Sequence, residues 1–354
     1  MNNHLPINTI NEKARKNLKS RSIFSILIVA YIVILIVFFL IANVNPQWVK
    51  NNVTNQIFAW LILISLLPII FLITKEIRDI HFKKNVFALF FLFFCLIIVI
   101  YTPTLIYFLP MYKIVFLARE DQIFWFLISG LICFFFLLIT NIFYLWMQGL
   151  FKFKIIFVHL SLLSLSGGFV LSFLFFGFIK GWVTLSILYV ITACTDTFAY
   201  LSGMLFGKKK IASFISPNKT LAGFIGGILG STIICICLLI GLSFVPNQYN
   251  LLGNFFGIKF KYSINFLNTN NEYANFPLWW LIVIIILIIL SILSVVGDLS
   301  FSYIKRIYGI KDFSNLIPGH GGILDRIDSL SFVYCSFLLF IIMINLFSTN
   351  SPLI

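Results

Sequence analysis

The chain has 354 residues, of which 61% are hydrophobic, 18% are aromatic and only 10% are charged. Soluble domains are about 45–50% apolar and about 25% charged. A water-soluble fold of this length could not bury 43 Phe residues, and the mean hydropathy of +1.06 shows that apolar residues run through the whole chain. The composition excludes a soluble globular protein and predicts an all-α, polytopic integral membrane protein.

The formal net charge is +14 at pH 7. In a soluble protein this excess would suggest a nucleic-acid partner, but basic loops facing an anionic lipid leaflet explain it in a membrane protein. We therefore expect membrane lipids as partners and no nucleic acid. The six cysteines all lie in apolar runs with no CxxC pair, which argues against metal or redox chemistry at these thiols.

Nine apolar runs have the length of about 20 residues that a bilayer span requires. The segment 299–310 is too short and too charged to span alone, so we expect it in the interface or a polar cavity, and Pro68 is a candidate kink. The predicted spans are 23–43, 56–74, 85–107, 123–146, 155–178, 182–206, 221–245, 276–297 and 327–347.

The basic residues predict which way the spans face. With nine spans, 19 Lys and Arg residues fall on one side and six on the other. The positive-inside rule then makes the N-terminus cytoplasmic in a multi-pass protein of the plasma membrane. It also places the polar loops 207–220 and 298–326 in the cytoplasm.

An ionisable residue interrupts the sixth predicted span. Asp196 lies within it, where a carboxylate costs at least ~2.5 kcal/mol, so a functional role is favoured over a helix-packing hydrogen bond involving Thr197. In the loop that follows, Lys209 and Lys210 are typical of a segment that touches the leaflet. Lys219, after the Ser216-Pro217 turn and beside Thr220 as helix cap, is better placed to meet an anion.

The densest polar cluster runs from Ser294 to Ser329. If this segment is helical at its start, Asp298, Ser302 and Lys305 share one face, because they recur at i, i+4 and i+7. Asp325 and Asp328 are three residues apart at the head of the last span, which predicts two carboxylates on one side that could hold a divalent cation.

A glycine turn lies between these acids. Gly319, His320, Gly321 and Gly322 would let the main chain approach a ligand and offer N–H groups to phosphate oxygens. A flexible interhelical loop would be the alternative for an isolated turn, but the flanking charges favour a phosphate site. His320 is interpreted as a phosphate donor in preference to a turn residue or a general acid.

The motifs S-x-x-G-D-L-x-x-S-x-x-K-R, K-D and I-P-G-H-G-G-x-L-D-R-x-D, at residues 294–328, resemble the signature of the CDP-diacylglycerol synthases (phosphatidate cytidylyltransferases). Upstream, D-T-x-A-Y-x-x-G-x-x-F-G-K and I-S-P-x-K-T resemble a second family cluster. The resemblance covers residues 192–329. The chain departs from the family pattern at Asn218, Leu221, Ala222, Phe301 and Ser314.

The resemblance implies that CTP and phosphatidate react to give CDP-diacylglycerol and pyrophosphate in phospholipid biosynthesis. It implies a Mg²⁺ site, with a second cation such as K⁺. Asp298, Asp325 and Asp328 are the expected metal ligands, with Lys305 and Ser302 completing the catalytic set. Asp196 and Asp312 are further candidates. The expected phosphate-binding residues are Lys219, Arg306, Lys311, Gly319, His320, Gly321, Gly322, Arg326 and Ser216.

Residues 181–354 are therefore predicted to form the catalytic half. Residues 1–180, with the first five spans, are candidates for lipid access or a homodimer contact. Two other functions remain open from the sequence: a CTP-dependent polyprenol or phytol kinase, and a transporter lined by Asp196 and a Gly-rich helix. A CDP-alcohol phosphotransferase is disfavoured because its characteristic acidic motif is absent.

Overall fold

The computed structural model describes residues 31, 34–35, 37–38, 52–82, 85–108, 119–180, 182–212, 214–217, 219–243, 276–314, 316 and 321–347. This described part is helical and contains no β-strand, apart from one isolated bridge between Lys210 and Thr220. The helices are α2 (Asn52–His81), α3 (Val86–Phe108), α4 (Arg119–Met147), α5 (Phe153–Phe175), the π-helical turn η2 (Phe176–Lys180), α6 (Trp182–Phe206), α7 (Leu221–Ser243), α9 (Phe276–Ile307) and α10 (Asp328–Phe347).

Seven of the described helices, α2 to α7 and α9, are long and apolar enough to cross a membrane, and α10 contains a shorter apolar stretch, Asp328–Met343. These helices correspond to the second to ninth predicted spans. The first predicted span, 23–43, lies almost wholly outside the described residues. The protein is thus an all-helical, multi-span membrane protein, whereas the count of nine stays a prediction.

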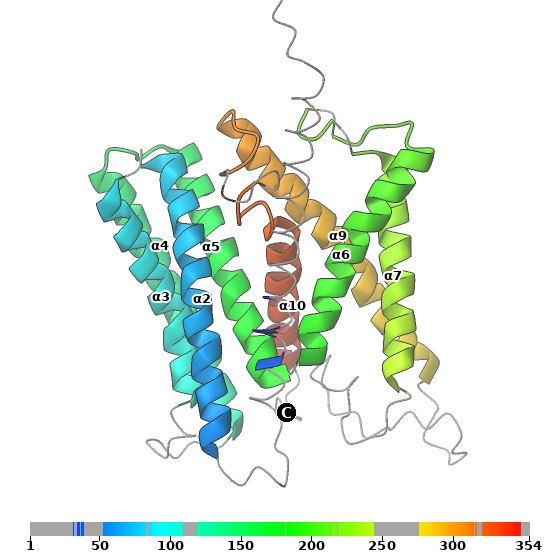
Figure 1. Cartoon of the computed structure of the whole chain (residues 1–354), viewed down its shortest axis with the longest axis horizontal. Helices are drawn as coiled ribbons and strands as arrows, with labels where there is room; N and C mark the ends of the chain where they lie inside the picture. The colour runs from blue at the N-terminus through cyan, green and yellow to red at the C-terminus, as the bar shows by residue number, and fades with distance from the viewer. Residues whose placement is uncertain are drawn as a thin grey trace, which may run out of the picture.

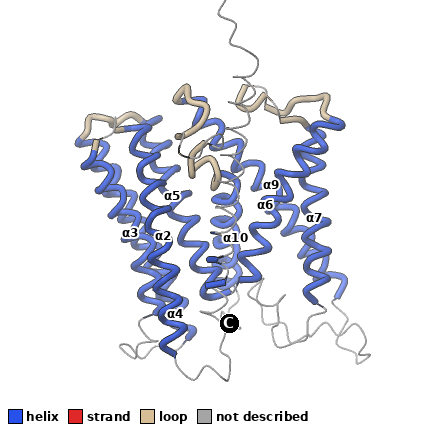
Figure 2. The backbone as a smooth tube through the Cα atoms, viewed as in Figure 1, coloured by secondary structure: helices blue, strands red, loops and turns tan. Residues whose placement is uncertain are grey.

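The helices form two groups around α10. Figure 1 shows α2 to α5 together on one side and α6 and α7 on the other, with α9 running obliquely behind α6 and α7 to a position above α10. Helix α10 packs against α5, α6 and α9, so it joins the two groups. The described connections, drawn as loops in Figure 2, all lie at one end of the bundle. The loops 207–220 and 308–327 therefore share an end, as the charge distribution predicted.

Two predictions about the polar cluster need correction, one on the segment 299–310 and one on the helical face shared by Asp325 and Asp328. Helix α9 does not stop at Gly297 but continues to Ile307, so the charged stretch extends the same helix instead of forming a separate interfacial segment. Charged residues end a hydropathy run but are compatible with a helix that leaves the apolar layer. Helix α10 begins at Asp328, so Asp325 lies in the turn before it and not on the same helix.

The closest helix contact joins α6 and α7. A Cβ atom at Gly227 would lie 2.9 Å from the carbonyl oxygen of Thr195, and one at Gly230 would lie 2.4 Å from the ring of Phe198. Side chains at these positions would force the helices apart. The Gly-rich start of α7 is therefore a packing surface, as predicted, and it fixes the loop 207–220 between the two helices.

Candidate active site

The loop 207–220 is tied to α9 by an ion pair. Lys219 Nζ lies 2.6 Å from Asp298 Oδ2, and both side chains are partly exposed. Asp298 Oδ1 accepts a 3.3 Å hydrogen bond from the Ser302 hydroxyl one turn later, so the predicted shared face of Asp298 and Ser302 is confirmed. A carboxylate, a hydroxyl and an ammonium group thus meet at the end of α9.

Local hydrogen bonds explain the position of Lys219. The Thr220 hydroxyl accepts a 3.1 Å hydrogen bond from the N–H of Gly223, so Thr220 caps α7 as predicted. The main chain of Lys219 accepts a bond from Ile211, and Lys209 accepts one from Leu221. These contacts hold Lys219 immediately before the N-terminus of α7, where the helix dipole favours an anion.

A second contact fixes the same loop from α9. The exposed Arg306 donates a 3.2 Å hydrogen bond from Nε to the carbonyl oxygen of Ile215. Ser216, the next residue, is half-buried, and its main chain closes the turn with Ala212 and Lys219. The guanidinium of Arg306 therefore lies beside the Ser-Pro turn.

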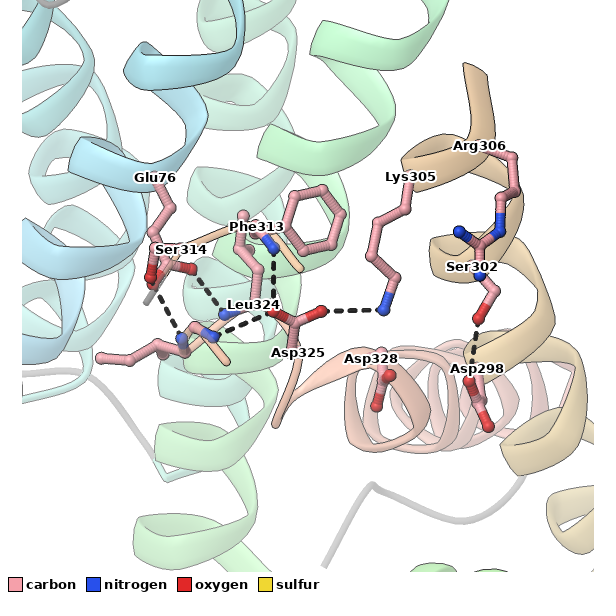
Figure 3. Close-up of polar contacts among 12 residues, drawn as sticks. Glu76, Asp298, Ser302, Lys305, Arg306, Phe313, Ser314, Leu324, Asp325 and Asp328 are labelled. Carbon is pink, nitrogen blue, oxygen red and sulfur yellow. Dashed lines mark hydrogen bonds and ion pairs between the residues drawn. The ribbon is translucent and has the colours of Figure 1, made fainter. Parts of the chain in front are cut away.

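Asp325 organises the loop between α9 and α10. Its Oδ1 atom lies 2.8 Å from Lys305 Nζ, and its Oδ2 atom accepts 2.9 Å hydrogen bonds from the N–H groups of Phe313 and Gly322. Figure 3 shows these contacts as dashed lines, with the Lys305 side chain extending from α9 toward Asp325. Both carboxylate oxygens are therefore engaged, and a metal at Asp325 would have to replace one of these contacts.

A buried acid that the sequence interpretation missed lies on the other side of this loop. Glu76 of α2 is only 2% exposed. It accepts hydrogen bonds from Ser314 Oγ at 2.6 Å and from the N–H groups of Ile323 and Leu324 at 2.8 Å. One signal was available: acids are scarce in this chain, and Glu76 is one of eleven.

Three carboxylates gather below the loops. Asp298 interacts electrostatically with both Asp196 of α6 and Asp328 at the start of α10. Lys219 offsets the charge near Asp196, and Lys305 offsets it near Asp328. The helices α6, α9 and α10 thus bring together acids that are far apart in the sequence, with two lysines at the rim.

The remaining predicted residues fall into two groups. Lys311, Asp312 and Arg326 are exposed on the loop between α9 and α10, while Gly321 and Gly322 are buried within it. Gly321 has a φ of +78°, a conformation that favours glycine. Gly319 and His320 lie outside the described residues.

The donor set fits a hard cation only in part. No group of three His, Cys, Asp or Glu side chains within the described residues is arranged to hold a metal ion. Asp298 and Asp328 nevertheless supply carboxylate oxygens whose negative charges repel each other, and a cation between them would relieve that repulsion. Oxygen ligands suit Mg²⁺, which usually keeps several waters and shares its coordination with substrate phosphates. Asp298 also has partners, Lys219 and Ser302, but its side chain is 30% exposed. Asp325 fits less well because its side chain is only 7% exposed and is held by Lys305 and two N–H groups.

A helical membrane protein with paired acids, exposed cations and a glycine-containing loop at one end of its bundle has the features of a phosphate-handling membrane enzyme. Residues 12–344 match the family model described as the cytidylyltransferase family. The chain belongs to this family, which confirms the resemblance based on the two motif clusters.

Individual relatives agree with this assignment. A Mycoplasma pneumoniae protein, provisionally named a phosphatidate cytidylyltransferase, is 36% identical over 189 residues, covering 47% of this chain and 45% of that protein. The phosphatidate cytidylyltransferase of Staphylococcus saprophyticus is 34% identical over 163 residues, 46% of each chain. That of Staphylococcus aureus strain COL is 37% identical over 145 residues, 41% of this chain and 44% of the relative. The matches thus span somewhat less than half of these relatives.

Proposed function

We propose that this protein is a phosphatidate cytidylyltransferase, which converts CTP and phosphatidate into CDP-diacylglycerol and pyrophosphate. The observation that carries the proposal is the meeting of Lys219 and Asp298, because it unites the two motif clusters at one end of the bundle. The family membership and the names of the relatives support the same reaction.

The chemistry follows from the charges of the substrates. An oxygen of the lipid phosphate attacks the α-phosphorus of CTP, and the bond between that phosphorus and the oxygen bridging to the β-phosphate breaks to release pyrophosphate. A phosphate dianion is already nucleophilic, so the reaction needs charge neutralisation and alignment more than a strong base. Lys219, Lys305 and Arg306 provide cationic groups within or beside the ion pairs described above.

We assign Mg²⁺ binding to Asp298 and Asp328. The family resemblance implies Asp325 as a third ligand, but its contacts with Lys305 and two N–H groups favour a role in holding Lys305. A bound Mg²⁺ would neutralise phosphate oxygens and orient the triphosphate. A second cation such as K⁺ belongs to the same proposal. Ser302, bonded to Asp298, would orient that carboxylate toward the ligand. Arg326, Lys311 and the glycine turn at Gly319, His320 and Gly321 would contact phosphate oxygens, while the N–H of Gly322 stays with Asp325.

CTP is a cytoplasmic solute, so the proposed orientation turns the end that carries loops 207–220 and 308–327 toward the cytoplasm of the cell. The loop ends of the described helices carry most of the basic residues, which supports this orientation. Phosphatidate would then enter sideways from the inner leaflet of the plasma membrane. A homodimer contact through the first five spans stays a prediction.

The test is a label-transfer experiment with purified protein, phosphatidate, Mg²⁺ and CTP labelled at either the α- or the γ-phosphorus. The proposal predicts that the α-label enters the lipid while the γ-label leaves as pyrophosphate. Entry of the γ-label into a polyprenol or other lipid alcohol would instead identify a kinase. Absence of transfer, combined with solute uptake into vesicles, would favour the transporter interpretation.

A further inference from the structure

The buried carboxylate of Glu76 connects the first half of the chain to the loop that carries Asp325. Its three hydrogen-bond donors are Ser314, Ile323 and Leu324, which lie 238 to 248 residues further along the chain. A buried charge requires such compensation, because an unpartnered carboxylate away from water is strongly destabilising. The contact is therefore part of a defined arrangement between α2 and the loop.

Gly322 shows how closely this carboxylate and the loop approach. A Cβ atom at Gly322 would lie 2.5 Å from Glu76 Oε1, so no larger residue fits without displacing one of the two. The N–H of Gly322 points to the other side, where it donates to Asp325 Oδ2 at 2.9 Å. Gly322 thus lies between two carboxylates that hold opposite sides of the same turn.

The hydrogen bond between Leu324 and Glu76 also affects Lys305 of the candidate site, because Leu324 is next to Asp325. Leu324, whose N–H Glu76 accepts, directly precedes Asp325 in the chain, and Asp325 Oδ1 holds Lys305 Nζ at 2.8 Å. Figure 3 shows the succession from Glu76 through the loop to Asp325 and Lys305. Displacing the main chain at Leu324 would move the carboxylate that fixes the Lys305 ammonium group.

Helix α2 also contacts the other end of this segment. His81 Nε2 lies 2.9 Å from the hydroxyl of Tyr308, two residues after Arg306 and just beyond the end of α9. The last two turns of α2 thus contact both the start and the end of the loop that joins α9 to α10. Glu76 makes three of these contacts and His81 one.

We propose that Glu76 is a positioning residue for the transfer reaction. Its hydrogen bonds to the N–H groups of residues 323 and 324 fix the main chain next to Asp325, and the position of the Asp325 carboxylate fixes the Lys305 ammonium group. This role rests on the proposed function. Glu76 touches neither substrate nor metal in this account. The first half of the chain then has a defined role, because Glu76 of α2 holds the loop that carries the charged residues.

The test compares Glu76→Gln with the matched variant Asp79→Asn. Asp79 lies three residues after Glu76, and its side chain is partly exposed and paired with Arg78, so this variant removes one negative charge from the same helix end. We expect Glu76→Gln to lower kcat about tenfold or more, which corresponds to ~1.4 kcal/mol or more of transition-state stabilisation. The KM values for CTP and phosphatidate should change less than about threefold, and Asp79→Asn should retain wild-type kinetics.

Hydrogen exchange provides a readout that does not depend on turnover. Amide exchange in the peptide 321–327 should quicken about tenfold or more in Glu76→Gln, while exchange in residues 328–340 of α10 should stay unchanged. If Glu76→Gln does not fold, Ser314→Ala removes one of the three donors and should lower kcat about threefold with the same local exchange pattern.

Three outcomes would overturn the inference: faster local exchange with unchanged kcat, lowered kcat with unchanged local exchange, or equal losses in Asp79→Asn. Failure of the wild-type protein to make CDP-diacylglycerol would overturn the proposed function instead. In that case the exchange measurement would still decide whether Glu76 holds the loop.

Discussion

Lys219 Nζ and Asp298 Oδ2 lie 2.6 Å apart, although 79 positions separate the two residues in the chain. This ion pair joins the capped start of α7 to the polar end of α9. Because both partners remain partly exposed, an incoming phosphate can compete for the ammonium group and a cation can compete for the carboxylate. The pair is therefore suited to exchange partners when charged substrates bind.

Replacing Lys219 by alanine should raise the KM for CTP about tenfold to a hundredfold, since hydrogen bonds to charged groups contribute about 1.5–3 kcal/mol. Lys209→Ala removes the same charge from an exposed side chain of the same loop, and its kinetics should stay within about twofold of wild type, as expected for a weak surface charge. Steady-state kinetics of both purified variants check this. Equal effects would indicate bulk electrostatics of the loop.

The metal assignments separate Asp298 from Asp325. Asp298→Asn should raise the Mg²⁺ concentration needed for half-maximal activity about tenfold or more, because it removes a charged oxygen ligand. Asp325→Asn should lower kcat by releasing Lys305, with the Mg²⁺ requirement unchanged. Titrating Mg²⁺ against initial rate distinguishes them. A raised requirement in Asp325→Asn would make Asp325 a metal ligand, as the family resemblance implies.

Gly322→Ala tests the crowded turn between the two carboxylates. Its new methyl group would overlap Glu76 Oε1, and overpacking of this kind costs about 1–3 kcal/mol. We expect lower thermal stability and at least tenfold slower turnover. Gly241→Ala, at a position with open space around it, is the matched control and should behave as wild type. Full activity of Gly322→Ala would show that the turn tolerates displacement.

Hydropathy was sufficient to predict most of the helices. The sixth predicted span, 182–206, coincides with α6, and the cap at Thr220 follows from a local rule that needs no tertiary information. The predicted span ends at Gly297 because hydropathy responds to the apolar layer, whereas helix α9 continues through Asp298 and Lys305 to Ile307.

The partners of the site residues were harder to predict. Asp325 was assigned to a metal because its spacing to Asp328 suggests a shared helical face, but the turn before α10 directs it to Lys305 and two N–H groups. Glu76 lies among Lys75, Arg78 and Asp79, a pattern typical of a solvated helix end. Only the packing of α2 against the distant loop makes Glu76 a buried acid.

Accessibility of the carboxylate cluster gives a further prediction. In a background without the six native cysteines, Ser216→Cys should react with an impermeant maleimide from the cytoplasmic side. Thr269→Cys lies between the predicted spans 221–245 and 276–297, where the predicted orientation places the chain outside the cell, and it should react from the outside. Thr197→Cys, exposed on α6 beside Asp196, should react slowly from the cytoplasm and be protected by CTP.

Two results of this labelling would contradict the account. Reaction of Ser216→Cys from the outside would reverse the proposed orientation. An inert Thr197→Cys would separate Asp196 from the substrate-accessible site and return it to helix packing. Retained activity of the cysteine-free protein is the necessary control.

The central claim is that the two polar clusters form one site for cytidylyl transfer to phosphatidate. The most direct measurement is pyrophosphate release by the purified protein, followed together with CDP-diacylglycerol formation. We predict one pyrophosphate per CDP-diacylglycerol, dependence on both CTP and phosphatidate, and loss of both products in Lys305→Ala. Pyrophosphate release without phosphatidate, no release at all, or unchanged release in Lys305→Ala would contradict it.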